Sequence, residues 1–179
     1  PKYLPMTEHW NFLVSNLKNE WFSILSSDDE VKPNFVKTIK EGIKKSKSAI
    51  LIRGGADYID KNGRVLNTSK LLSMREITRP PQTFYEQLEG SKVNFSAFAL
   101  RKSIWEKVGG FPESLEVNAD WGMWLNASLY GEFISQHKTI SRYRVNYRPN
   151  LKNERLISEL KDDLTVYNEF FSSIIKKIS

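Results

Sequence analysis

The sequence lacks several of the residue types that build common functional sites. Its 179 residues include no cysteine and two histidines, His9 and His137. Disulfides and thiolate metal sites are therefore excluded, and a zinc site of the usual kind is not expected. No apolar run approaches the roughly 20 residues that a membrane-spanning helix needs, and no secretory signal segment is visible. These absences are compatible with a reducing cytoplasm, which is the location that we expect.

The composition supplies a packed core and an excess of positive charge. Hydrophobic residues make up 40% of the chain and aromatic residues 12%, which suffices for about one globular domain. The net charge of +6 favours an anionic partner such as a nucleotide diphosphate, a nucleic acid or an acidic membrane surface. The lysines are dispersed, however, and no arginine-rich tract or nucleic-acid motif is present. We therefore interpret most of these charges as solvated helix faces and expect no nucleic-acid partner.

Apolar periodicity predicts an α/β protein. Residues 21–25 and 48–53 are short apolar runs typical of strands, and Pro33 between them opens a segment with helical periodicity. This βαβ spacing predicts parallel pairing of the two strands. Asn62-Gly63 predicts a hairpin with a type I′ turn. The other expected elements are helices at 6–18, 103–108 and 119–130, strands at 93–100, 133–136 and 139–144, and a long loop with one helical turn at 67–92.

The last third of the chain predicts one long amphipathic helix. Apolar residues recur at steps of three and four: Leu156, Leu160, Leu164, Tyr167, Phe171, Ile174 and Ile178. We expect this stripe to face the core or a partner. The chain would then divide into a body, residues 1–150, and a helix, residues 151–179. That helix would pack on the body, on a second copy of the chain or against a membrane surface.

Adjacent carboxylates suggest the first functional site. The apolar run from Trp21 leads through Ser26 and Ser27 to Asp28 and Asp29. Carboxylates at the end of a strand lie where open α/β sheets bind ligands. They can hold a divalent cation, which in turn can hold a diphosphate. The pattern favours nucleotide-sugar chemistry; the alternative is that both residues only cap a turn.

Two later segments carry a resemblance to a known family. Residues 107–115 read Lys-Val-Gly-Gly-Phe-Pro-Glu-Ser-Leu, and residues 118–124 read Asn-Ala-Asp-Trp-Gly-Met-Trp. With Ser-Ser-Asp28-Asp29 ahead of them, their order and spacing resemble the family 2 glycosyltransferases, from about residue 7 to 147. The resemblance implies a partial GT-A fold: an α/β mixed sheet with flanking helices, here followed by the long C-terminal helix. It also implies that most of the nucleotide pocket lies ahead of Pro1, so that this chain alone would be inactive.

The resemblance assigns roles to the acidic residues. Asp28, with Asp29, would ligate Mg²⁺ or Mn²⁺, while Ser26 and Ser27 would lie on the diphosphate side of the donor; Ser26 stands where the family often has an aspartate. Asp120 would be the general base that takes the proton of the acceptor hydroxyl during an inverting displacement. The alternative for Asp120 is structural, because the dipole of a helix favours an aspartate in its first turn.

Five residues are weaker candidates for the acceptor side: Asn94, Ser96, Trp121, Arg142 and Arg144. Each has a structural alternative, since Trp121 follows core spacing and the arginines suit an exposed strand. The implied reaction moves a sugar from a nucleotide-diphosphate donor to a saccharide or lipid-linked saccharide, in polysaccharide or cell-surface glycan synthesis at the inner face of the membrane. The alternatives are a non-catalytic binding or assembly subunit and a basic nucleic-acid binder.

Overall fold

The computed structural model describes residues 3–69, 71, 74–145 and 152–178. Seven strands and six helices follow one another in these residues. In chain order they are α1 (Met6–Ser15), β1 (Trp21–Phe22), β2 (Glu30–Val31), α2 (Phe35–Lys45), β3 (Ala49–Ile59), β4 (Val65–Thr68), β5 (Ile77–Thr78), α3 (Gln82–Leu88), β6 (Phe98–Arg101), α4 (Lys102–Val108), α5 (Ala119–Ala127), β7 (Glu132–Arg144) and α6 (Lys152–Ile178).

Two long parallel strands, β3 and β7, form the middle of one mixed sheet with the order β1-β6-β3-β7-β2. The outer edge of β3 is shared by β6 and then β4, both antiparallel to it. The outer edge of β7 is shared in the same way by β5 and then β2. The strands β3 and β7 therefore bring together segments that are far apart in the sequence.

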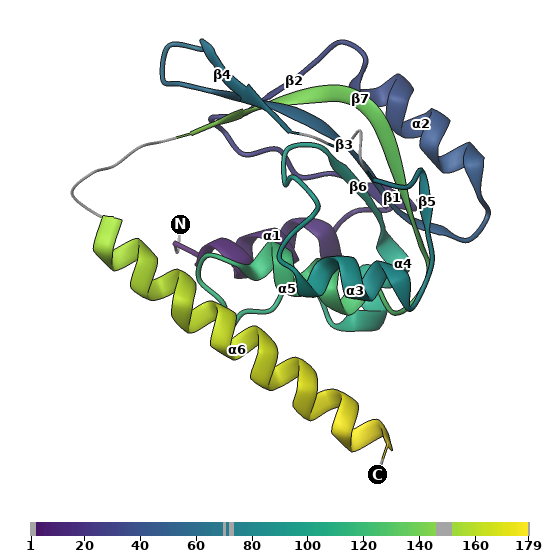
Figure 1. Cartoon of the computed structure of the whole chain (residues 1–179), viewed down its shortest axis with the longest axis vertical. Helices are drawn as coiled ribbons and strands as arrows, with labels where there is room; N and C mark the ends of the chain where they lie inside the picture. The colour runs from purple at the N-terminus through teal and green to yellow at the C-terminus, as the bar shows by residue number, and fades with distance from the viewer. Residues whose placement is uncertain (1–2, 70, 72–73, 146–151, 179) are drawn as a thin grey trace.

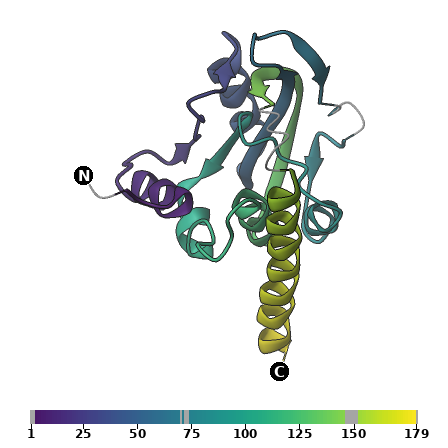
Figure 2. The ribbon, with the colours of Figure 1, turned by 90° about the vertical axis from the view of Figure 1, so that its left-hand side faces the viewer.

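Helices cover both faces of this sheet (Figure 1). The helix α2 packs on one face, where Ile39, Ile52 and Ile134 belong to one apolar cluster. The helices α1, α3, α4 and α5 lie on the other face, over a larger cluster that includes Phe98 and Trp124. The helix α6 lies outside this helical layer and extends beyond the rest of the molecule (Figure 2).

The two central strands bend at one place. Arg53 pairs with Ser135, but the next aligned pair is Gly55 with Thr139, so β7 carries extra residues there. Gly54 lies at the bend, where an added Cβ would stand 2.4 Å from Cδ1 of Ile140. A side chain at position 54 would therefore push the two strands apart. The sequence analysis expected two strands here, and the structure has a single bent one.

The predicted βαβ unit is partly wrong. The strands β1 and β3 both pair antiparallel with β6, so they run parallel to each other with β6 between them. The predicted hairpin is present as β3 and β4, but its type I′ turn is wrong, because Gly63 has a positive φ of 82° and Asn62 does not. The Asp60 carboxylate accepts the amides of Asn62 and Arg64 at 2.9 Å, which favours a longer turn. The predicted loop at 67–92 contains β5 and α3.

The stripe predicted on α6 meets the body of the molecule only in part, and a partner-facing role for the rest of it stays a prediction. Leu156, Leu160 and Leu164 are 51%, 54% and 65% exposed, whereas Asp162, Val166 and Phe170 are buried. These three buried residues are shifted by two positions from the three leucines. A shift of two residues is a rotation of about 200° around the helix axis, so the two sets lie on opposite sides of α6. Among the predicted stripe residues Tyr167 does contact the body, while the side chains of Ile174 and Ile178 lie outside the described residues. No helix in the described ranges is long and apolar enough to cross a bilayer.

Candidate active site

Asp120 lies in the first turn of α5, and it lines a cavity together with residues of α6. Its Oδ1 atom accepts the backbone amide of Trp121 at 2.7 Å. Burial raises the pKa of Asp120 to about 6, although hydrogen bonds from the backbone oppose the shift. A carboxylate with this pKa is largely deprotonated at neutral pH and still basic enough to take a proton from a hydroxyl that is reacting.

Asp120 lies in the wall between two cavities. The first, which we call the strand-side cavity, has a volume of about 400 Å³. The second, the helix-side cavity, has a volume of about 550 Å³. Asp120, Ser91 and Tyr143 line both. The strand-side cavity is otherwise lined by Gly54, Tyr58, Ser69, Leu71, Met74, Lys92, Val93, Asn94 and Phe95. The helix-side cavity is otherwise lined by Leu88, Glu89, Gly90, Val117, Asn118, Trp121, Glu159, Asp163 and Tyr167.

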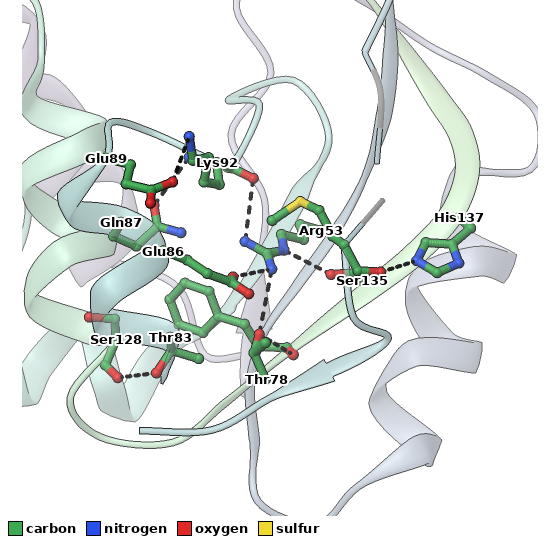
Figure 3. A network of polar contacts seen from close by, with 12 residues as sticks. Arg53, Thr78, Thr83, Glu86, Gln87, Glu89, Lys92, Ser128, Ser135 and His137 are labelled. Carbon is green, nitrogen blue, oxygen red and sulfur yellow. Dashed lines mark hydrogen bonds and ion pairs between the residues drawn. The ribbon is translucent and has the colours of Figure 1, made fainter. Parts of the chain in front are cut away.

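A buried arginine holds the segment that lies between the two cavities. Figure 3 shows Arg53 of β3 pointing toward α3, where it donates to Glu86 at 2.7 Å and to the Lys92 carbonyl oxygen at 3.5 Å. It also donates to Ser135 at 2.9 Å. Burial lowers the pKa of Arg53, and the Glu86 carboxylate opposes that shift. The network fixes the loop that carries Ser91 and Lys92 against the sheet.

A glutamine connects the same loop to α5. The side-chain oxygen of Gln87 accepts the Lys92 amide at 3.2 Å (Figure 3 shows Gln87 beside Lys92). The backbone carbonyl oxygen of Gln87 accepts the Trp121 indole N–H at 2.7 Å. Because Trp121 follows Asp120 in α5, the loop and the acidic helix start have a common support. The sequence analysis did not find this support, since neither Arg53 nor Gln87 belongs to a motif.

Asp28 and Asp29 form a corner against the end of β7. Asp29 is 7% exposed, and its Oδ1 atom accepts the Arg144 amide at 2.7 Å. The Arg144 guanidinium donates to the Asp28 carbonyl oxygen at 2.8 Å and to Glu30 at 2.8 Å. Burial raises the pKa of Asp29, against the opposing hydrogen bond from Arg144. The Asp29 carboxylate thus binds the peptide unit between Tyr143 and Arg144. Because Tyr143 lines both cavities, this contact connects the turn at Asp28 and Asp29 to the cavity walls.

We tested whether this corner fits the Mg²⁺ or Mn²⁺ that the resemblance implies. The Oδ2 atom of Asp29 is buried and has no hydrogen-bond partner, so it could accept a cation. Among the described residues, no group of three or more histidine, cysteine, aspartate or glutamate residues is placed so that it could hold a metal ion by itself. Asp28 and Asp29 alone would not complete the coordination of such an ion, so diphosphate and water oxygens would have to supply its remaining ligands. Their role as metal ligands, and the donor-side role of Ser26 and Ser27 in the same turn, stay predictions.

The candidates for the acceptor side are divided between two places. Asn94 lines the strand-side cavity, where its side chain accepts the Ser96 hydroxyl at 2.7 Å. Trp121 lines the helix-side cavity. Arg142 and Arg144 line neither cavity; both bind Glu30 beside Asp28 and Asp29. The acceptor-side role of these five residues stays a prediction.

Tyrosines of three other elements line the cavities without belonging to any motif. Tyr143 near the end of β7 and Tyr58 near the end of β3 are paired in the sheet, and their rings are 5.8 Å apart. Tyr167 belongs to α6, which the sequence analysis treated as a separate packing element. Aromatic residues at strand ends are too common to have been selected from the sequence, because most of them only cover a core.

Comparisons with known proteins show what the chain is similar to. Curated relatives include an uncharacterized glycosyltransferase of Rickettsia typhi, 22% identical over 182 residues that cover 94% of this chain and 51% of the relative. A second, from Rickettsia prowazekii, is 23% identical and covers 93% and 50%. The chain thus spans about half the length of the curated relatives that it matches. No protein-family model matches it.

Solved structures share the fold. S. aureus TarS 1-349 matches with a TM-score of 0.60 and 15% identity, over 78% of this chain and 40% of that one. TarS 1-349 in complex with UDP matches with a TM-score of 0.55 and 16% identity, over 79% and 40%. The predicted α/β transferase fold is confirmed. The resemblance to glycosyltransferases is likewise confirmed by the curated relatives.

Proposed function

We propose that the chain is the acceptor-side and metal-side part of an inverting glycosyltransferase, with Asp120 as its general base. The observation that carries this proposal is the place of Asp120, a carboxylate of raised pKa in the wall shared by two cavities. A base must reach the acceptor hydroxyl while that hydroxyl faces the donor, and a shared wall between two cavities provides such a place.

The donor is a nucleotide-diphosphate sugar. The curated relatives named glycosyltransferases and the UDP complex of TarS support this class of donor. We place its diphosphate near Asp28 and Asp29, which would hold Mg²⁺ or Mn²⁺ together with the phosphate oxygens. When bound, the ion neutralises the charge that develops on the leaving diphosphate. The whole protein would use a saccharide or a lipid-linked saccharide as the acceptor.

In this mechanism the acceptor O–H donates its proton to the Asp120 carboxylate as the oxygen attacks the anomeric carbon. The new bond joins that carbon to the acceptor oxygen, and the bond to the diphosphate oxygen breaks with its electron pair leaving on the nucleoside diphosphate. Attack from the face opposite the leaving group inverts the anomeric configuration. The Trp121 amide on Oδ1 orients the Asp120 carboxylate for this transfer.

The test is nucleoside diphosphate release by the whole protein with a panel of nucleotide sugars. We predict that Asp120→Asn lowers kcat by at least about 100-fold, because it removes the base. We also predict that kcat/KM of the unmodified protein rises with pH through about 6, where Asp120 loses its proton. Glu106→Gln, a change of charge on an exposed face of α4, is the control and leaves both quantities unchanged. Equal rates for Asp120→Asn and Glu106→Gln would disprove the assignment of the base and favour a binding subunit.

A further inference from the structure

We propose that the helix-side cavity is the acceptor subsite and that α6 forms its specificity-determining wall for a neutral saccharide. This inference rests on the proposed function, because it assigns one of the two cavities beside Asp120 to the acceptor. Three residues of α6 line that cavity: Glu159, Asp163 and Tyr167.

The charges of the two cavities differ in the direction that this assignment requires. Carboxylates line the helix-side cavity from three elements or their ends, namely Glu89, Asp120, Glu159 and Asp163. Among its lining residues, all within the described ranges, there is no lysine, arginine or histidine. The strand-side cavity has Lys92 in its wall. A diphosphate is therefore repelled from the helix-side cavity and tolerated on the strand side, next to the strand ends that meet Asp29.

Aromatic rings and hydrogen-bonding groups give the helix-side cavity the character of a sugar site. Trp121, Tyr143 and Tyr167 line it together with Ser91 and Asn118. The rings of Trp121 and Tyr167 meet edge to face at 5.6 Å, and the Tyr167 hydroxyl donates to the Leu88 carbonyl oxygen at 3.1 Å. Rings held in this way offer apolar faces to the C–H groups of a sugar, while amide, hydroxyl and carboxylate groups receive its hydroxyls.

The helix α6 also holds the segment that leads into Asp120. The buried carboxylate of Asp162 accepts the amides of Glu116, Val117 and Asn118 at 3.2, 2.6 and 2.8 Å. The Asn118 side chain donates to Asp163 at 2.7 Å. Because Asn118 immediately precedes α5, these contacts fix the cavity wall and the first turn of α5 together. Asp162 is thus a positioning residue for Asp120.

The experiment titrates the ¹⁵N-labelled protein with methyl β-D-glucoside and follows the indole signals of its five tryptophans. Trp121→Phe assigns the relevant signal. We expect the glucoside to shift the Trp121 signal, and Tyr167→Ala to weaken binding about two- to tenfold, because an aromatic contact of the sugar is lost. Leu164→Ala, an exposed position on the same helix, is the matched control and leaves binding unchanged. Tyr167→Phe keeps the ring and stays within about twofold of the unmodified protein.

A second probe tests the charge of the cavity without disturbing its packing. Methyl β-D-glucuronide, which adds one negative charge, should bind about two- to fivefold more weakly than the glucoside, since exposed charges act with modest strength. Glu159→Gln should reduce this difference, and Glu154→Gln, the same change outside the helix-side cavity on α6, should not. If Tyr167→Ala fails to fold, this pair of glutamates decides the question by itself.

The outcomes separate this inference from the proposed function. Shifts of the backbone amides of Tyr58 and Lys92 without a shift of the Trp121 indole signal would overturn the subsite. So would no binding of either probe, or equal effects of Glu159→Gln and Glu154→Gln. If that happens while Asp120→Asn abolishes transfer, the base is correct and the subsite is wrong. If the probes bind as expected while Asp120→Asn transfers at the normal rate, the subsite stands and the base is wrong.

Discussion

The buried pair of Arg53 and Glu86 offers a quantitative test of how the site is held. The Arg53 side chain is fully buried and the Glu86 side chain 18% exposed, and their charged groups are 2.7 Å apart. Arg53→Met removes the cation and leaves Glu86 and Ser135 without their main partner. Breaking a buried pair on one side costs about 3–5 kcal/mol, so we predict a loss of that size in the free energy of unfolding.

A double-mutant cycle isolates the part of this loss that belongs to the pair. Glu86→Leu alone leaves Arg53 charged in the interior and should also destabilise strongly. The double variant Arg53→Met/Glu86→Leu removes both charges, and we expect it to lose about 1–3 kcal/mol less than the sum of the two single variants. Urea unfolding followed by tryptophan fluorescence measures all four free energies. If the two single losses add up to the loss of the double variant within about 0.5 kcal/mol, the two residues do not act as a unit.

Two further predictions concern Asp162 and Asp120. Asp162→Asn should lower the free energy of unfolding by about 1–3 kcal/mol, because the asparagine NH₂ would face amides that in the unmodified protein donate to the carboxylate. The same variant should also shift the pH midpoint of kcat/KM. A loss of packing alone would lower only the melting temperature. For Asp120 the folded-state pKa of about 6 lies above the ordinary value of 3.8, so stability falls as pH rises between these values, by at most about 3 kcal/mol. Asp120→Asn should flatten the stability curve between pH 4 and 6 by that amount, and parallel curves for the two proteins would refute the raised pKa.

The acidic helix start was predictable because its determinants are local. Asn118, Asp120 and the apolar positions of α5 are contiguous, and Gly109 ends the preceding helix in the predicted place with a φ of 88°. The strand pairing was less accessible, since β6 inserts between β1 and β3 from a segment more than forty residues farther along the chain. Local periodicity contains no information about which distant strand enters such a gap.

The face of α6 that packs on the body has a specific physical basis. Besides Tyr167 of the predicted stripe, it uses a line of buried residues that begins with Asp162. A carboxylate is favourable at a buried position when several backbone amides donate to it, and here the amides of residues 116–118 do so.

The proposed role of Asp120 as the base depends on residues that no motif contains. Two segments line the cavities beside Asp120. One is the loop whose backbone Arg53 and Gln87 bind, and the other is the helix α6, whose Asp162 binds the turn before α5. Both supports act on backbone groups, so they constrain where Asp120 lies without contacting a substrate. A chain can therefore keep residues 118–121 unchanged and still hold the Asp120 carboxylate in the wrong position. For this reason we expect the loss of Asp162 to change the pH dependence of catalysis as well as stability.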